Sequence, residues 1–222
     1  MRPASEHYAK FNPGGRRTSD GISGMRLVDL PVPSSPVACL AREVATEFQS
    51  TAMLNHCERS YLWAAAYGLS RGIEFDAELL FVASQLHDLG LAAPFDAHAV
   101  DFEHAGAAVA WVFGAGAGWP VTRRRRTGEI IVAHMADAVD VSSDPEGFLL
   151  ELATALDISG RRADDWPAEL RAEVLADYPR LDLAAEFGRC FADQARRKPS
   201  STAAGAVSSG INERLRANPL ER

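Results

Sequence analysis

The sequence predicts an all-α fold, because its apolar residues recur at helical spacing along most of the chain. No segment alternates apolar and polar residues over the length of a strand, and no repeat recurs along the chain. A chain of 222 residues can also bury a core without a disulfide or a metal. We therefore expect one helical domain at residues 27–200, a flexible leader at 1–26 and a C-terminal tail at 201–222.

Capping residues and helix breakers mark the limits of the expected helices. Gly72 ends one helix after Arg71, and Asp76 can cap the next one, which runs to Gly90. Pro145 fits the first turn of a later helix, where its missing N–H has no helical partner to lose. The expected helices span residues 37–49, 52–71, 76–90, 102–113, 121–136, 145–157, 166–176 and 181–195.

The charge and composition of the chain exclude several classes of protein. A net charge of −7 argues against a nucleic-acid partner. We interpret the basic run Arg123–Arg126 as a solvated helix N-terminus instead of a phosphate site. The sequence has no apolar run long enough to form a transmembrane helix. Its three scattered cysteines are typical of reduced thiols, which predicts a cytoplasmic protein.

Five titratable residues lie within strongly apolar helical patterns: His56, His87, Asp88, His134 and Asp157. A buried imidazole or carboxylate without a partner is costly, so each needs one. For any one of them, a hydrogen bond within the core or at a helix end is sufficient. Together they form a nitrogen and oxygen ligand set that suits zinc, iron or manganese. Helical bundles build metal sites in this way, from side chains on facing helices.

At these positions the sequence resembles the HD-domain metalloenzymes, an all-α superfamily with the ordered signature H…HD…D. His56, the adjacent pair His87-Asp88, and Asp157 match that signature in order. A narrower resemblance, to the cyanamide hydratase-like branch, covers roughly residues 27–202. The matching segments are LVDLPVPSSPVACLAREVA at 27–45, Leu54–Tyr61, Leu86–Gly90, Phe102–Ala107, Asp144–Glu146, Thr154–Gly160 and Arg197–Pro199.

The resemblance implies an all-α HD domain with a metal site in its core. The implied ligands of a divalent transition metal are His56, His87, Asp88 and Asp157, and zinc is expected ahead of Fe(II) or Mn. Dinuclear relatives place another histidine four residues before a Gly-Ala pair, where this chain has Phe102. We therefore expect a single metal ion per chain.

The implied activity is that of a metal-dependent hydratase, which adds water to cyanamide, or to a similar small nitrile-like substrate, to give urea. A divalent ion lowers the pKa of a water that it binds and polarises the substrate. His134 is the candidate proton donor, with Asp88 as the second catalytic residue. If a second metal bound, His134 would be a ligand instead. Asn55, Arg59 and Glu103 are candidates for contacts to the substrate or to the metal ligands.

Two alternatives remain open on the sequence. An HD-type phosphohydrolase acting on a nucleotide or another phosphate ester would need cations, which Arg59 and Arg123–Arg126 could supply. A regulatory domain would keep a structural metal or none. The expected partner is a small-molecule substrate, without nucleic acid or membrane. Apolar helices such as 37–49 are candidates for a homo-oligomer interface.

Overall fold

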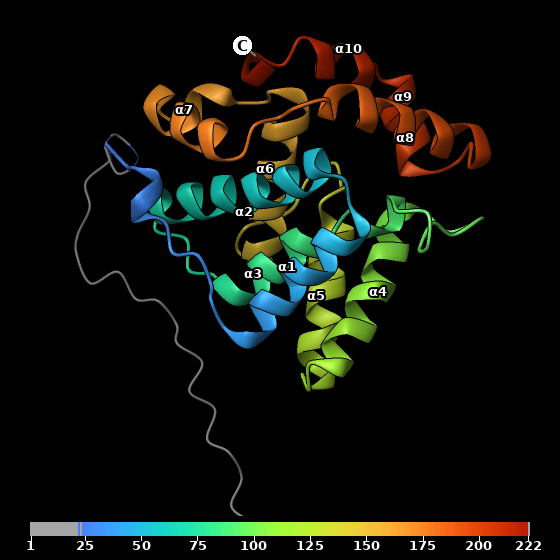
Figure 1. Cartoon of the computed structure of the whole chain (residues 1–222), viewed down its shortest axis with the longest axis horizontal. Coiled ribbons are helices and arrows are strands. Elements are labelled where there is room, and N and C mark those ends of the chain that lie inside the picture. The colour runs from blue at the N-terminus through green and yellow to red at the C-terminus, as the bar shows by residue number, and fades with distance from the viewer. Residues whose placement is uncertain (1–21, 23, 222) are drawn as a thin grey trace, which may run out of the picture.

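The structure is a computed structural model that describes residue 22 and residues 24–221 (Figure 1). The described residues are all-helical and include no strand, which confirms the predicted fold class. Most of the predicted leader at 1–26 lies outside the described residues. The α-helices are α1 (Pro36–Phe48), α2 (Thr51–Arg71), α3 (Ala77–Leu86), α4 (Phe102–Gly116), α5 (Val121–Ala133), α6 (Pro145–Ser159), α7 (Ala168–Asp177), α8 (Leu183–Arg197), α9 (Thr202–Ser208) and α10 (Ile211–Arg216).

Helix α2 runs through the middle of the molecule. Figure 1 shows α7–α10 as a layer on one side of α2, and α1, α3, α4 and α5 on the other. Helix α6 packs along α2. From His56 to Gly68, every residue of α2 is buried, whatever its polarity. Polar side chains on this helix must therefore find partners inside the protein.

Capping residues act at the ends of these helices, Asp76 and Gly72 among them as predicted. Asp76 accepts a hydrogen bond from the backbone of Leu79 at the start of α3, and Asp144 does the same for Gly147 in α6. Gly72 and Gly160 adopt the left-handed conformation after α2 and α6, with φ of 66° and 70°. The limits of these helices are therefore set by local sequence.

The helix expected to run from 76 to 90 ends earlier, at Leu86. His87 and Asp88 form a turn, which leads into a short 3-10 helix at Leu89–Leu91. Gly90 lies directly against the backbone of α4, where an added Cβ would collide with the carbonyl oxygen of Phe102. The close approach of α4 therefore depends on Gly90. This approach coincides with the early end of α3.

The C-terminal residues also differ from expectation. Residues 202–221, placed in a tail by their low content of large apolar side chains, form α9, α10 and a final 3-10 helix. Ala203, Ile211, Leu215 and Leu220 are buried. Helix α9 packs on α8, and α10 packs on α8 and α6. A few well-spaced apolar residues are enough here because α6 and α8 supply the rest of the core.

The loop between α3 and α4 is fastened to the end of α8. Asp96 accepts a hydrogen bond from Gln194 at 2.9 Å and pairs with Lys198. The ammonium group of Lys198 also donates to the carbonyl oxygen of Val100 at 2.6 Å. These contacts hold α8 beside the turn that carries His87 and Asp88.

Helix length and hydropathy bear on the predicted absence of a membrane partner. Among the described residues, no helix combines the length and the apolar character needed to span a membrane.

Candidate metal centre

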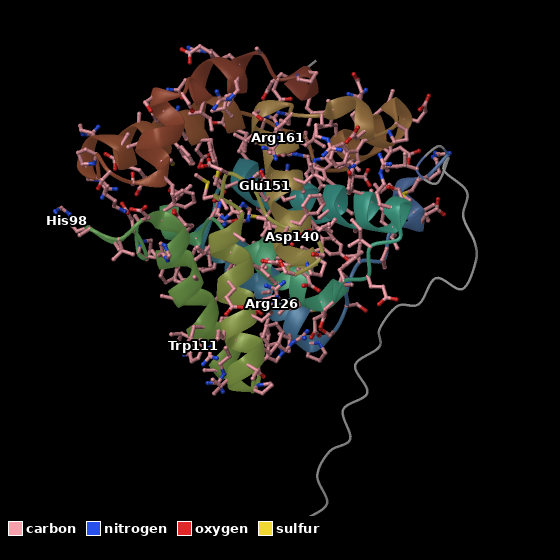
Figure 2. The ribbon with its side chains drawn as sticks, turned by 180° about the vertical axis from the view of Figure 1, so that it is seen from behind. His98, Trp111, Arg126, Asp140, Glu151 and Arg161 are labelled. Carbon is pink, nitrogen blue, oxygen red and sulfur yellow. The ribbon has the colours of Figure 1, made fainter. Side chains whose placement is uncertain are left out.

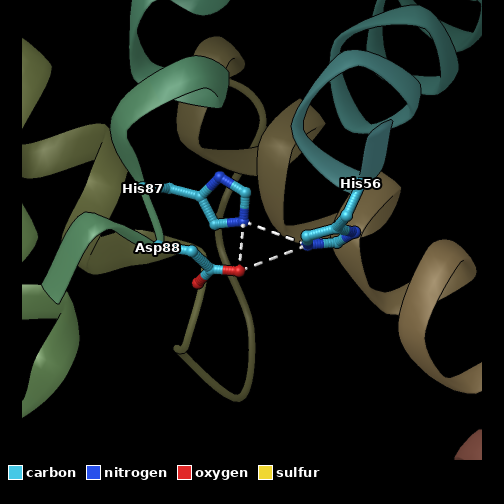
Figure 3. Close-up of side chains that lie close together, drawn as sticks. All are labelled: His56, His87 and Asp88. Atoms are coloured by element: carbon cyan, nitrogen blue, oxygen red, sulfur yellow. Dashed lines mark hydrogen bonds and ion pairs between the residues drawn. The ribbon is translucent and has the colours of Figure 1, made fainter. Parts of the chain in front are cut away.

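Three buried side chains converge between α2 and the turn that follows α3 (Figure 3). The Nε2 atoms of His56 and His87 lie 3.2 Å apart. Oδ2 of Asp88 lies 3.4 Å from Nε2 of His56 and 3.2 Å from Nε2 of His87. Among the described residues, this is the only cluster of three His, Cys, Asp or Glu side chains close enough to share an ion.

The triangle of ligand atoms has the dimensions of a metal site. Atoms bound tetrahedrally to zinc at its usual ligand distances lie about 3.3–3.4 Å from one another. The three measured separations are 3.2, 3.2 and 3.4 Å. Two imidazole nitrogens and one carboxylate oxygen also form a donor set that zinc accepts. The residues present therefore fit a divalent transition metal.

Asp88 shows the clearest need for a cation. Its side chain is buried, and neither carboxylate oxygen accepts a hydrogen bond from the described residues. Burial raises the pKa of Asp88, but the neighbouring His87 and His56 lower it overall to well below its usual range. The group is therefore an anion in a buried place, where charge must be compensated.

The two histidines present the same ring nitrogen to this cluster. Nδ1 of His87 donates to the backbone carbonyl of Ser84 at 2.8 Å, and Nδ1 of His56 lies 2.7 Å from Oδ2 of Asp157. With the proton on Nδ1, each Nε2 carries a lone pair directed at the shared point. Hydrogen bonds of this kind orient metal-binding histidines in proteins.

Asp157 lies behind His56 and does not face His87. Its carboxylate accepts hydrogen bonds from His56, from Nε and Nη2 of Arg59 at 2.8 Å, and from Nε1 of Trp63 at 3.1 Å. The structure thus brings three of the four predicted ligands together and leaves Asp157 as the hydrogen-bond partner of the first. Its assignment as a direct ligand stays a prediction.

The partners of Asp157 come from one face of α2. Arg59 follows His56 by three residues and Trp63 follows His56 by seven, which places all three on the same side of a helix.

Burial raises the pKa of Asp157, but the Arg59 guanidinium lowers it overall to well below its usual value. Burial lowers the pKa of His56, yet its contacts with Asp157 and Asp88 raise it overall. Asp157 is therefore a buried carboxylate with a fully paired charge.

Two further residues that sequence reasoning missed hold the backbone of Asp157. Its carbonyl oxygen accepts hydrogen bonds from Arg180 and from Nδ2 of Asn218, the latter at 2.8 Å. Arg180 and Asn218 lie in segments without periodicity, so no sequence signal pointed to them. Trp63 did carry a signal, its spacing of seven residues from His56.

His134 follows the last residue of α5 and lies beside the cluster. Its Nδ1 donates to the carbonyl of Ile131, and its Nε2 lies 3.9 Å from Oδ1 of Asp88. Burial and the nearby His87 lower the pKa of His134 to about 3. The ring of Phe102 lies 5.6 Å from that of His134, in the adjacent space. His134 is therefore a neutral imidazole whose Nε2 carries a lone pair on the side of Asp88.

The other predicted contact residues point elsewhere. Asn55 donates to the carbonyl of Pro179 at 2.8 Å, and Glu103 accepts from Thr202 at 2.8 Å. Neither Asn55 nor Glu103 lines the cavity beside the cluster. Arg59 contacts Asp157, as described above, and not the cavity. Two other histidines, His98 and His104, are exposed, and His98 projects from its loop in Figure 2.

A cavity of about 870 Å³ extends outward from the cluster. The metal-site end is formed by His56, His87, Asp88 and His134. Helices α6, α8, α9 and α10 contribute the remaining walls together with the segment after α5. The other lining residues are Met135, Ala136, Asp137, Thr154, Ala155, Ile158, Ser159, Arg161, Phe187, Phe191, Thr202, Gly205, Ala206, Ser209, Ile211 and Arg214.

The basic run at the start of α5 takes part in ion pairs elsewhere. Arg123 pairs with Asp76 and Glu78. Arg126 pairs with acidic residues at the start of α6. Arg123 and Arg126 therefore link helices, and no residue of the run lines the cavity beside the cluster.

A scan against models of known protein families and a search of the curated proteins each found no match to this chain. The described residues define an all-α protein whose buried His56, His87 and Asp88 could hold a metal ion. What the protein does must therefore be inferred from this site.

Proposed function

We propose that the protein is a mononuclear, metal-dependent HD-domain enzyme of the cyanamide hydratase-like type. It would add water to a small nitrile-like substrate such as cyanamide, giving urea. The observation that supports this most strongly is the convergence of Nε2 of His56, Nε2 of His87 and Oδ2 of Asp88. The order of these residues in the H…HD…D signature supports the same assignment.

In this proposal His56, His87 and Asp88 hold the ion, and Asp157 orients His56 through Nδ1. When bound, the ion lowers the pKa of a coordinated water and polarises the substrate. Zinc is the proposed metal, ahead of Fe(II) or Mn, because two imidazoles and one carboxylate are a common zinc ligand set.

His134 is the proposed proton carrier. Its Nδ1–H is held by the carbonyl of Ile131, so Nε2 has a free lone pair on the side of Asp88. Nε2 accepts a proton from the water that adds to the substrate, and then donates it to the substrate nitrogen. This refines the role expected from the sequence, because a neutral imidazole must take a proton before it can act as an acid.

The space beside His134 supports one ion per chain. Phe102 fills the position where dinuclear relatives carry a further histidine, and its ring packs against both His134 and Phe191. A second ion beside His134 would meet an aromatic ring, which offers no lone pair. The proposal therefore needs one metal and no other cofactor.

A phosphohydrolase remains a second candidate because of one observation. Arg59, Arg123 and Arg126 are engaged by carboxylates outside the cavity, but Arg161 and Arg214 line the cavity. These two guanidinium groups could hold part of a phosphate ester. An assay of product formation separates the two functions.

The test is a panel of cyanamide, simple nitriles and nucleotides, each assayed with zinc, Fe(II) and Mn(II). We expect urea from cyanamide with the wild-type protein, none with His87→Ala, and unchanged formation with His104→Ala, which alters an exposed histidine. Release of phosphate from nucleotides without urea formation would favour the phosphohydrolase. Metal binding without turnover of any substrate would favour a regulatory domain.

A cytoplasmic location belongs to the same proposal. Cys39, Cys57 and Cys190 are free thiols in the structure. Three unpaired cysteines are typical of proteins in a reducing compartment.

A further inference from the structure

The cavity is much larger than the substrate named above. Its volume is about 870 Å³, whereas pockets for drug-sized ligands span roughly 300–1,000 Å³. A water molecule occupies about 30 Å³ in the liquid, and cyanamide has only three heavy atoms. The cavity therefore has room for a molecule with many more atoms than cyanamide.

The wall next to the metal cluster is apolar and aromatic. Phe187 and Phe191 lie one turn apart on α8, and their rings stack with centroids 4.3 Å apart. The ring of Phe187 lies 5.9 Å from that of His56. Ile158 on α6 and Ile211 on α10 extend this wall. A hydrocarbon or aryl group would be desolvated against these side chains.

Cationic residues lie on α10 and at the end of α6, two elements that pack together. Arg161 follows Gly160 and pairs with Glu151, which lies beside it in Figure 2. Arg214 on α10 donates to the carbonyl oxygen and the hydroxyl of Ser209, which carries no charge. Among the described residues, Arg214 forms no ion pair with a carboxylate, so it adds a positive charge to a cavity that also has an apolar wall.

One acidic residue also lines the outer part of the cavity. Asp137 is exposed and follows α5, an element separate from α6 and α10. It could contact a cationic or hydroxyl group of a ligand. In the part of the chain that the structure describes, Asp137 forms no ion pair with Arg214, whose hydrogen bonds go to Ser209.

From these observations we infer that the cavity binds an organic anion with an apolar body. The acidic group contacts Arg214, and the apolar body lies along Phe187 and Phe191. The reacting group would then lie at the metal cluster, a placement that rests on the proposed function. The substrate class is thus a nitrile-like compound that also carries an acidic group, larger than cyanamide itself.

The test uses three probes with the same eight-carbon body and different head groups: octanoate, octanol and octylamine. Isothermal titration calorimetry measures their affinities for the purified full-length chain. We expect octanoate to bind most tightly. Arg214→Gln should weaken octanoate binding by about 3- to 10-fold, the usual worth of a partly exposed charge-assisted hydrogen bond, and should leave octanol binding unchanged.

Two matched variants serve as controls. Arg214→Lys keeps the charge and should retain the preference for octanoate. Arg216→Gln alters an exposed arginine that pairs with Glu213 outside the cavity, and should bind all three probes as the wild type does. Circular dichroism and thermal unfolding check that each variant is folded.

Three outcomes would overturn the inference. Octanol binding as tightly as octanoate would show that no cation recognises the head group, and absence of binding by all three probes would show that the cavity takes no such body. Loss of octanoate preference in His87→Ala, but not in Arg214→Gln, would show that the carboxylate binds the metal. Conversely, the wild-type protein could bind no metal while Arg214→Gln still weakens octanoate binding by the expected factor. That result would contradict only the proposed function.

Discussion

Nδ1 of His56 lies 2.7 Å from Oδ2 of Asp157, on the side of the imidazole ring that faces away from His87. Asp157 is itself held by Arg59 and Trp63. The carboxylate therefore fixes both the orientation and the tautomer of a metal-site histidine. It does so from α6, across the interface with α2.

Asp157→Asn should weaken zinc binding by about 10- to 100-fold, the usual cost of altering the hydrogen-bond partner of a metal ligand. Competition with a chromophoric chelator measures the affinity. Asp193→Asn, which changes a half-buried carboxylate on α8 that pairs with Arg196, is the control. If Asp157 were a direct ligand, as the family resemblance implies, the visible spectrum of the cobalt-substituted protein would also change. An unchanged spectrum supports the geometry described here.

Arg59→Leu should lower the free energy of unfolding by about 3–5 kcal/mol, because it leaves the buried charge of Asp157 without its main partner. Urea denaturation measures this change. Arg216→Leu removes an exposed guanidinium and should change stability by less than about 0.5 kcal/mol. Equal effects of the two substitutions would contradict the role assigned to Arg59.

The effect of Arg59→Leu should depend on pH in a defined direction. In the wild type the pKa of Asp157 is well below its usual value of 3.8. The ionised carboxylate therefore contributes fully to the free energy of unfolding above pH 3.8, and this contribution is lost as the pH falls towards the lowered pKa. In the variant, burial without Arg59 raises the pKa, and protonation then stabilises the folded state. The stability difference should shrink as pH falls from 7 towards 4. A constant difference across this range would contradict the pairing.

Gly90→Ala should destabilise the protein and reduce metal binding together, because its Cβ would collide with the carbonyl oxygen of Phe102 and displace the turn of His87 and Asp88. Gly205→Ala is the matched control. Gly205 lies within α9 with open space around it, so alanine should stabilise that helix by roughly 0.5–1 kcal/mol. Thermal unfolding and metal titration measure both effects. A Gly90→Ala protein with normal metal affinity would disprove the link between this contact and the site.

Much of the fold could be predicted because local rules set it. Asp76, Asp144, Gly72 and Gly160 cap helices as their residue types suggest. The early end of α3 could not be predicted in this way. It coincides with the approach of α4 to Gly90, a contact between residues that are distant in sequence.

The site was predictable to a similar degree. His56, His87 and Asp88 were found because polar residues in apolar helices need partners, and the structure brings them together. The position of Asp157 behind His56 depends on the register between α2 and α6, which sequence spacing does not specify. The cavity walls from α9 and α10 were missed because those helices contain few large apolar residues.

His134→Ala should keep the fold and the metal but lose about 10²- to 10⁴-fold in hydration rate, the usual worth of general acid–base catalysis. The pKa of about 3 makes this histidine neutral at physiological pH, so its Nε2 carries a lone pair. Steady-state assays and metal analysis measure the two properties. Loss of the metal would make His134 a ligand, and full activity would transfer its role to another residue.

Metal content per chain, measured by elemental analysis of the purified protein, tests the central claim most directly. We expect about one divalent transition metal ion per chain in the wild type and in His104→Ala. His87→Ala and Asp88→Ala should each abolish metal binding, because partial coordination lowers affinity steeply. Two ions per chain in the wild type, or retention of the ion in both of these variants, would contradict the account.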